Sequence, residues 1–300
     1  MDAYLAAMLV FAGLYALMAL GLNLAWGLAG MVNLGLAGFV AVGAYGSALL
    51  TVRLGWPMPL GIAAGTLLAA VAGAGLALLV ARLRGDYLAI VTLGFAEVIR
   101  LIASNETWLT NGTDGISGIP GPLRGAVTPQ QFNLVLLGLV WGSVGLVFLL
   151  SARLSHSPFG RVLRALREDE EVAAVAGKPV LAFRVRAFAL GTAICGLAGA
   201  LYAHYNGYVA PDGFAPLLTI YIVLALTAGG GGSMRGAVAG AVLVIVLLEG
   251  TRFLAGAIPG LAPVQHAALR EASVALALLL LLRWRQQGLI PERTLTKAAP

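Results

Sequence analysis

The charged side chains of this 300-residue chain are concentrated in one stretch, SPFGRVLRALREDEEVAAVAGKP from Ser157 to Pro179, within a sequence that is otherwise strongly apolar. Ser157 suits the cap of a helix that begins at Pro158, whose missing N–H costs nothing in the first turn. Gly177 suits a left-handed helix end, and the nearby Pro179 prevents continuation. The acidic and basic side chains alternate in sign along this stretch, which indicates a folded surface and not a disordered tail.

Two pairs of opposite charge within this stretch have helical spacing. Arg164 with Glu168, and Arg167 with Glu171, are four residues apart, so each pair would share one face of a helix. Asp169 could also cap a second short helix. One continuous helix, or a helix, a kink and another helix, therefore both remain open.

The same region holds the densest basic cluster of the chain. Its members are Arg153, Arg161, Arg164, Arg167, Lys178, Arg184 and Arg186. Because Lys and Arg are enriched in the cytoplasmic loops of membrane proteins, we expect residues 152–186, called here the charged loop, to face the cytoplasm.

Motifs for catalysis or cofactor binding are absent from the sequence. Gly229 to Gly232 is followed by Ser-Met-Arg, which does not make a nucleotide-binding loop, and no GxSxG occurs. The three histidines are far apart and have no ligand partner at metal-binding spacing. Cys195 is expected to be a structural thiol, and His204, near the end of an apolar run, an interfacial anchor. We expect no catalytic residue, no metal site and no cofactor bound by this chain.

The composition is that of a helical membrane protein. Hydrophobic residues make up 60% of the chain, charged residues 11%, and 40 residues are glycine, which is more apolar than a soluble core requires. The formal net charge of +6 comes from loops that flank apolar runs, so it indicates topology and not nucleic-acid binding. We predict an all-α polytopic fold in which residues 1–300 form one transmembrane domain.

Nine apolar runs approach the roughly 20 residues that a membrane-spanning helix needs. They cover residues 4–25, 28–50, 60–81, 87–104, 131–151, 186–206, 217–232, 236–254 and 268–283. The first run has no preceding basic residue, so we expect a retained span and not a signal peptide. The runs 28–50 and 217–232 are short and could enter and leave by the same face, so eight or nine crossings are expected, with a pseudo-repeat of two halves as one arrangement.

With the charged loop inside, alternation of the spans assigns the other loops. Nine crossings would put the N-terminus outside and the C-terminus in the cytoplasm, and residues 105–130 and 207–216 would be external. The basic residues then expected inside are Arg82, Arg84, Arg235, Arg283, Arg285, Arg293 and Lys297, while Arg124 is external and Arg53 is a mild exception.

Two glycine-rich segments interrupt the apolar pattern, one in each half of the chain. Gly27 to Gly46 places a glycine every three to five residues and includes Asn33, and Ala228 to Gly240 includes Arg235. Close helix packing and a substrate path between broken helices explain such breaks equally well. The residues expected to line a path are Gly30, Asn33, Gly35, Gly38, Gly230, Gly232 and Gly236.

Two apolar runs contain the same short pattern of a glutamate followed three residues later by an arginine. Glu97 and Arg100, and Glu249 and Arg252, are spaced three residues apart near the ends of their runs. Ion pairs at the membrane interface are the expected role of both.

Several segments, in this order, resemble one family. They are GLAGMVNLGLAGF, RLRGDYLAIVTLGFAEVIR, NGTDGISGIP, the charged stretch, LAGALYAHYNGYVAP and AGGGGSMRGAVAGA. The resemblance covers most of the chain, roughly Gly21 to Gly250. The chain is similar to the permease subunits of branched-chain amino acid ABC transporters of the LivM type. The resemblance implies a second, similar permease, two cytoplasmic ATPase subunits that bind the ATP, and an external substrate-binding protein, all at a bacterial cytoplasmic (inner) membrane.

The resemblance also gives the charged loop a role. Glu171 to Gly177 stands where such permeases carry an EAA-like loop that docks on the ATPase. The residues expected to couple the two are Ser157, Gly160, Arg161, Arg164, Arg167, Glu168, Glu171, Ala174 and Gly177. In the external loops 111–120 and 208–214, Asp114 and Asp212 are expected to meet the binding protein. The substrate is a branched-chain amino acid or a related amino acid or amide; no residue discriminates among them.

Two other classes compete with this interpretation. A self-sufficient secondary carrier or channel for small polar solutes fits the repeat but lacks buried coupling carboxylates. A structural membrane protein explains neither the capped charged loop nor the paired breaks.

Overall fold

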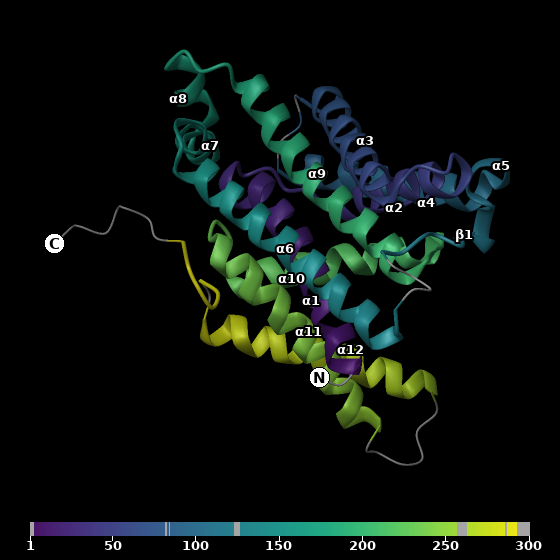
Figure 1. The fold of residues 1–300 in the computed structure, drawn as a ribbon. Helices are drawn as coiled ribbons and strands as arrows, with labels where there is room; N and C mark the ends of the chain where they lie inside the picture. The colour runs from purple at the N-terminus through teal and green to yellow at the C-terminus, as the bar shows by residue number, and fades with distance from the viewer. Residues whose placement is uncertain are drawn as a thin grey trace.

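The computed structural model describes residues 3–81, 83, 85–122, 127–256, 263–285 and 287–292. These form a bundle of helices with one small pair of strands (Figure 1). Arg82, Arg84, Arg124, Arg293 and Lys297, to which the topology expectation assigned sides, lie outside the described residues.

The helices follow the apolar runs. In chain order the elements are α1 (Ala3–Leu22), the π-helix η1 (Asn23–Leu28), α2 (Leu36–Arg53), α3 (Met58–Leu79), α4 (Asp86–Asn105), α5 (Thr107–Thr110), η2 (Gly112–Asp114), β1 (Ile116–Ser117), α6 (Pro129–His156), α7 (Pro158–Glu168), α8 (Glu170–Val175), α9 (Val180–Asn206), β2 (Tyr208–Val209), η3 (Pro211–Phe214), α10 (Pro216–Gly229), α11 (Met234–Gly256) and α12 (Pro263–Trp284). The all-α prediction is confirmed.

Seven helical segments within the described residues are long and apolar enough to cross a membrane. They are Tyr4–Leu28, Leu36–Arg53, Met58–Leu79, Asp86–Asn105, Pro129–His156, Val180–Asn206 and Pro211–Gly229. The two remaining predicted runs, 236–254 and 268–283, coincide with α11 and α12. The protein is therefore a polytopic helical membrane protein, and the count of eight or nine crossings stays a prediction.

The predicted span 28–50 has the wrong start. The first span continues through η1 to Leu28, and the next begins only at Leu36. Gly30 adopts a φ of 70°, which favours glycine and ends the helical path. The chain between 29 and 35 is the first break.

Helix α9 lies at the centre of one group of spans and packs on α2 and α3. Glycines allow the backbones to touch: a β-carbon at Gly43 would overlap the Gly196 carbonyl, one at Gly199 the Val40 carbonyl, and one at Gly65 the Gly43 carbonyl. Small residues at the crossing of membrane helices permit this close approach. We call α2, α3 and α9 the glycine-packed triplet.

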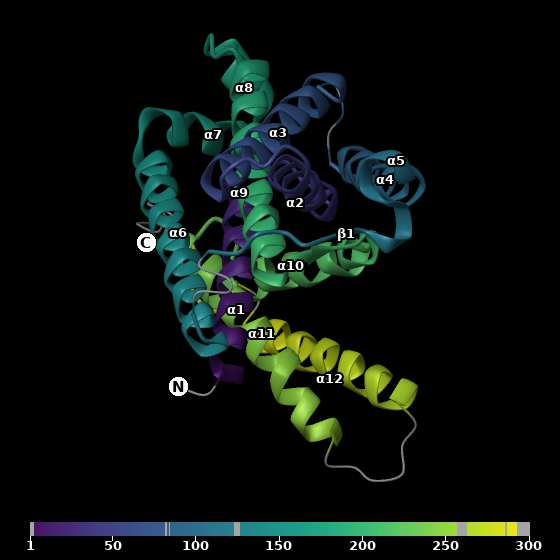
Figure 2. The same ribbon diagram turned by 45° about the vertical axis from the view of Figure 1, so that its right-hand side comes forward.

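A second group of helices surrounds α1, which packs on α6, α9 and α11. Helix α10 packs on α11, and α12 lies along α11 (Figure 2). Helix α4 lies at the margin of the bundle, where it contacts α2 and the short elements α5, η2 and η3. Figure 2 shows α4 on the opposite side of the molecule from α6.

Short elements gather at two places on the molecule. The charged-loop end carries α7 and α8, and the strand end carries β1, β2, η2 and η3 (Figure 1). Strands β1 and β2 pair antiparallel, with Ile116 opposite Val209 and Ser117 opposite Tyr208. Two loops that are far apart in sequence are thus joined at the strand end.

Candidate functional site: charged loop and glycine-rich breaks

The charged loop folds as two short capped helices, which decides between the alternatives left open by the sequence. The Ser157 side chain accepts a hydrogen bond from Gly160 N at 3.4 Å, and Pro158 occupies the first turn of α7. Asp169 then caps α8, because its Oδ1 accepts bonds from Glu171 N at 2.9 Å and Val172 N at 3.0 Å. Helix, kink and helix is the arrangement.

Glycines hold both ends of this loop, and the sequence predicts the one at Gly177. A β-carbon at Gly160 would overlap the Leu154 and Ser155 carbonyls, so the turn between α6 and α7 needs glycine. Gly177 has a φ of 75°, which confirms the left-handed end.

One face of the loop packs on the bundle, and the opposite face is exposed. Leu163 and Leu166 are buried, and the Phe159 ring stacks on Phe183 of α9 with centroids 5.2 Å apart. The outward face carries charged and apolar side chains together. Arg161, Glu168, Glu171 and Ala174 are exposed there, as are Val172 (65% exposed) and Val175 (91% exposed).

Arg167 points into the bundle. Its Nη1 donates to the Gly27 carbonyl oxygen of the first break and lies 2.9 Å from Glu292 Oε2. Arg164 turns to the end of α6, where its Nη1 donates to Ser155 O at 2.9 Å. The ion pair observed for Arg167 is therefore not the predicted four-residue pair with Glu171.

The two glycine-rich breaks meet at this point. The Asn23 side chain in η1 accepts a hydrogen bond from Gly232 N at 2.8 Å, and its amide nitrogen lies 3.3 Å from Met234 Sδ. Asn23 is fully buried, and π-helical turns are frequent at functional sites. Sequence reasoning missed Asn23; the available signal was a lone amide in an apolar run just before the first glycine of the break.

Residues 287–292 pack against the second break through backbone hydrogen bonds. Leu289 N donates to Ala228 O and Ile290 N to Gly229 O, both at 2.9 Å. Gly230 and Gly232 have φ values of 114° and 82°, and a β-carbon at Gly236 would lie 2.7 Å from both Gly229 O and Gly230 O. The glycines let three backbone segments come together.

A cavity of about 270 Å³ lies where the breaks and α7 meet. Its lining residues are Trp26, Gly27, Arg167, Leu226, Thr227 and Gly231. The cavity brings the first break, the second break and the charged loop to one place.

The deeper part of the first break packs against α4. Asn33 is buried and its Oδ1 accepts a hydrogen bond from Gly35 N at 2.8 Å. Thr92 Oγ1 accepts from Leu34 N at 3.0 Å, and Thr219 Oγ1 accepts from Ala37 N at 3.1 Å. These oxygens satisfy backbone N–H groups at the start of α2, which would otherwise be unpaired inside the membrane.

Gly35 and Gly38 face the α4 backbone directly. A β-carbon at Gly35 would overlap the Thr92 carbonyl, and one at Gly38 would lie 2.6 Å from Ala96 Cα. A leucine at either position would displace α4, so a leucine substitution there would test the packing of the helices and not the path alone. The path role of these two residues stays a prediction.

Arg184 of α9 is a second buried anchor of the charged loop. Its guanidinium donates to Ala81 O at 3.0 Å and Leu83 O at 2.8 Å and pairs with Glu170 of α8 at 3.4 Å. The sequence counted Arg184 only toward the basic cluster. Its position seven residues beyond Gly177 carries no signal for these contacts.

The strand end brings the two predicted binding-protein contacts together. Asp114 lies in η2 and Asp212 in η3, and both are exposed. The paired strands connect their loops, and the Tyr208 hydroxyl donates to Asp114 O at 2.9 Å.

The interpretation of His204 as an interfacial anchor is wrong. His204 is fully buried; Nδ1 lies 2.6 Å from Pro120 O and Nε2 lies 2.8 Å from Ser47 Oγ. The pattern assigns Nδ1 the proton, which it donates to the carbonyl, while Nε2 accepts from the serine. His204 thereby ties the loop that contains Pro120 to α2 and α9.

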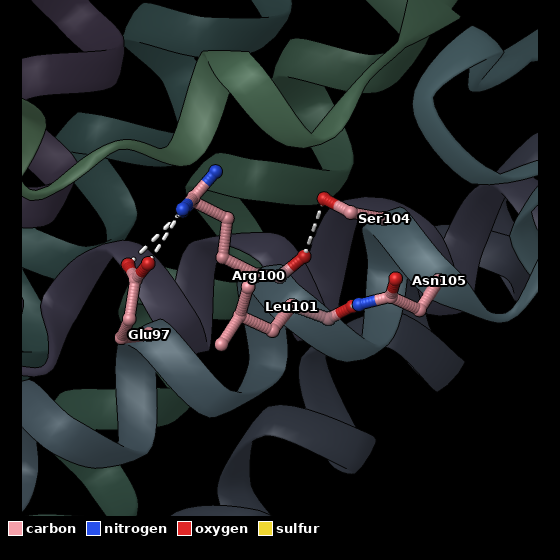
Figure 3. Close-up of polar contacts among 5 residues, drawn as sticks. All are labelled: Glu97, Arg100, Leu101, Ser104 and Asn105. Carbon is pink, nitrogen blue, oxygen red and sulfur yellow. Dashed lines mark hydrogen bonds and ion pairs between the residues drawn. The ribbon is translucent and has the colours of Figure 1, made fainter.

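Glu97 and Arg100 form the expected ion pair, drawn in Figure 3: Arg100 Nε and Nη2 donate to the two carboxylate oxygens at 3.0 and 2.5 Å. The pair does not lie at the helix end, because α4 continues to Asn105. In the second half, Glu249 accepts from the Tyr4 hydroxyl at 2.5 Å, and the Arg252 side chain lies outside the described residues.

Cys195 is buried, as expected of a structural thiol. In the part of the chain that the structure describes, no group of three or more His, Cys, Asp or Glu side chains could hold a metal ion.

Comparisons with known proteins place the chain in a family. It matches the model for "Branched-chain amino acid transport system / permease component" over residues 4–283. It is 33% identical, over 93% of its length, to the high-affinity branched-chain amino acid transport system permease protein LivM of Escherichia coli K12, of which 68% is covered. A probable LivM protein of Methanocaldococcus jannaschii is 30% identical over 95% of this chain and 92% of its own length.

A more distant relative carries a different cargo in its name. The autoinducer 2 import system permease protein LsrC of Escherichia coli O9:H4 is 30% identical over 51% of this chain and 42% of that protein. No solved structure matches the chain. The chain belongs to the family of branched-chain amino acid transport system permease components, and it is the membrane-spanning permease subunit of an ABC transporter whose ATPase is a separate subunit.

Proposed function

We propose that this chain imports branched-chain or chemically related amino acids across the bacterial cytoplasmic membrane. It acts with a second, similar permease, two ATPase subunits bound at the charged-loop end, and an external binding protein at the strand end. In this orientation the charged loop is cytoplasmic, and nine crossings place the N-terminus outside. The LivM relatives, whose names specify branched-chain amino acids, support the substrate class.

The contact of Arg167 with Gly27 and Glu292 is the observation that carries the coupling proposal. A permease without an ATP site must receive work through a mechanical contact. Arg167 extends from α7 into the junction where the two breaks meet, so a displacement of α7 is felt by both breaks. Arg167 is therefore an inward transmitter in the proposal, and not a register residue on the docking face.

The docking face itself lies on α8 and the exposed side of α7. Val172 and Val175 expose apolar surface in a loop that is otherwise charged, which suits a contact that excludes water. Arg161, Glu168 and Glu171 surround it and set the register by charge. The caps at Ser157 and Asp169 keep both helices short and rigid, so force is transmitted and not absorbed.

The experiment that tests coupling changes Gly177 in two ways. Gly177→Val forces a β-branched residue into a left-handed conformation, whereas Gly177→Asn keeps a residue that tolerates it. No atom lies within 4 Å of a β-carbon there, so only the backbone is strained. We expect valine, and Glu171→Lys separately, to abolish ATP-driven uptake in vesicles, and asparagine to retain most of it.

The readouts separate docking from folding. The valine and lysine variants should stay inserted and folded, and should lose the ATPase subunits on purification or hydrolyse ATP without transport. If both variants keep the ATPases and transport at the normal rate, the coupling role belongs to another loop.

The translocation path follows the two breaks in this proposal, with Gly30, Asn33, Gly35 and Gly38 on one side and Gly230, Gly232 and Gly236 on the other. The cavity between the breaks would be its inner mouth. Thr227→Trp fills that cavity from α10, and Thr227→Ser serves as the matched control. We expect tryptophan to block uptake while the ATPases remain bound; unchanged uptake would place the path elsewhere.

The competing carrier hypothesis is tested in the same vesicles. Uptake by the isolated chain on an ion gradient, without internal ATP or ATPase subunits, would overturn the importer.

A further inference from the structure

The exposed face of α4 has two edges of different chemistry. With 3.6 residues per helical turn, Glu97, Arg100 and Ser104 share one edge, while Val98 and Ile102 lie on the opposite edge. Between the two edges the face is apolar. The buried face, with Thr92, Ala96 and Ala103, packs toward the bundle.

The polar edge is unusual for a membrane span. The side chain of Glu97 is 38% exposed and that of Arg100 26% exposed, although α4 is one of the membrane-spanning candidates. Asn105 is the last residue of α4, so at about 1.5 Å per residue the pair lies about 8 to 12 Å from that end. Charged side chains at such depth face water-filled cavities or protein partners, because hydrocarbon does not solvate them.

We propose that this edge of α4 lines a water-filled entrance and binds the zwitterionic head of an α-amino acid. The Arg100 guanidinium receives the carboxylate, and the Glu97 carboxylate receives the ammonium. This inference rests on the proposed import of amino acids and names the residues that would meet the substrate first.

The ion pair has the composition that such an exchange needs. Arg100 uses Nε and Nη2 on Glu97, and Figure 3 shows its other terminal nitrogen directed away from the carboxylate. A guanidinium has five N–H donors, so an incoming carboxylate finds free donors before the ion pair opens. The zwitterion replaces one internal ion pair by two intermolecular ones, with no change of net charge.

Weak binding follows from this exchange, and weak binding suits a path. The substrate must displace an existing ion pair, so part of its binding energy is lost to breaking that pair. A site on a conduit has to release its solute as readily as it takes it up. The remaining apolar surface between the edges accommodates the aliphatic side chain without a polar requirement.

The position of the pair agrees with entry at the strand end. Helix α4 contacts η2 and η3, which carry Asp114 and Asp212. A binding protein seated on these two loops would release its amino acid directly above the polar edge.

Ser104 allows the test without breaking the ion pair. Its hydroxyl donates to the backbone oxygen of Arg100 at 2.9 Å and does not contact the Arg100 guanidinium (Figure 3). We compare Ser104→Cys with Ile102→Cys, on opposite edges, in the assembled transporter, using a charged, membrane-impermeant thiol reagent. The native Cys195 is buried, so its own reaction with the reagent should add little to the labelling. The Ser104→Cys transporter should react with the reagent, and the Ile102→Cys transporter should not.

Protection by ligands then tests recognition of the zwitterion. Leucine should slow labelling of Ser104→Cys, whereas leucinamide, which lacks the carboxylate, and 4-methyl-2-oxopentanoate, which lacks the ammonium, should need at least tenfold higher concentrations. Adding Arg100→Gln should remove the difference between leucine and leucinamide, and Arg100→Lys should restore part of it. Glu97→Gln should remove the difference between leucine and the oxo acid.

Each other outcome overturns the proposal. Failure of both cysteine variants to react would mean that lipid or a partner subunit covers the edge, and equal reaction would mean that the two edges do not differ. Labelling without protection would leave an entrance that does not bind amino acids. ATP-driven leucine uptake by the Ser104→Cys transporter is measured alongside, so failure of the import function itself is recognised separately.

Discussion

The two ends of the molecule hold their loops by different interactions. At the charged-loop end, Arg167 and Arg184 reach from helices to backbone carbonyls and pair with Glu292 and Glu170. At the strand end, the loop that contains Pro120 is held by neutral hydrogen bonds of buried His204 and by paired strands.

The difference concerns how easily each attachment can be remade. An ion pair between partly exposed side chains is weak and is screened by salt, while a buried hydrogen bond costs its desolvation penalty when broken. The charged-loop end therefore combines one strong anchor, Arg184, with one exchangeable contact, Arg167. The strand end is held by contacts that are harder to break and remake.

The largest expected effect is that of Arg184→Ala. The change breaks the ion pair with Glu170 and removes the donor that the Ala81 and Leu83 carbonyls share in a largely buried place, at a cost of about 3 kcal/mol. Thermal unfolding in detergent measures it. Arg186→Ala, an exposed position on the same helix, is the control and should change the unfolding temperature little; equal effects would show that Arg184 is not an anchor.

His204→Ala should rank second, at roughly 2 kcal/mol, because it leaves Ser47 and the Pro120 carbonyl unpaired and opens a cavity. Since the bonds are neutral, the loss should be the same at low and high salt. The exposed His156→Ala is the control. A loss that shrinks with added salt would contradict the contrast between the two ends.

Arg167→Gln and Glu292→Gln should each destabilise the chain by about 1 kcal/mol or less, since the pair is 26% and 18% exposed and is screened. Their main effect should be ATP hydrolysis that no longer requires the loaded binding protein. The double variant should be no worse than the single ones if the two residues act as a pair. Additive losses, or loss of the ATPases, would assign Arg167 to docking.

The smallest effect on stability is expected for Asp114→Lys with Asp212→Lys, within about 0.5 kcal/mol because both are exposed surface positions. Binding-protein-stimulated ATP hydrolysis should fall severalfold. Gln130→Lys, which adds positive charge at the start of α6 instead, is the control. Unchanged stimulation would remove these two residues from the binding-protein contact.

Local features of the fold were predictable from the sequence. Ser157 and Gly177 act within one or two turns of the chain, so their residue types suffice to indicate a cap and a left-handed end. Apolar runs likewise located the helices. The start of the second span was misplaced because the hydropathy of 28–35 does not reveal that Asn33, Thr92 and Thr219 cap a helix there.

Contacts between distant segments could not be read from types and spacing. Asn23 meets Gly232 and Arg167 meets Glu292 across more than a hundred residues, and a single sequence contains no signal for such partners. His204 was misassigned for the same reason: its position in the run is that of an anchor, and only the three-dimensional fold supplies Ser47 and Pro120. Residues that make contacts between elements were thus missed more often than residues that determine the elements themselves.

The glycine-packed triplet also limits how the transporter can change shape. Where α2 crosses α3 and α9, glycines bring backbone against backbone at Gly43, Gly65 and Gly199, so these helices cannot slide past one another without losing close contact. They must move as one rigid body, and hinges are confined to their connections with the other helices. Helix α9 follows directly after the charged-loop helices, and α2 follows directly after the first break. A displacement of α8 would therefore be transmitted to the first break by the rigid body that α2, α3 and α9 form.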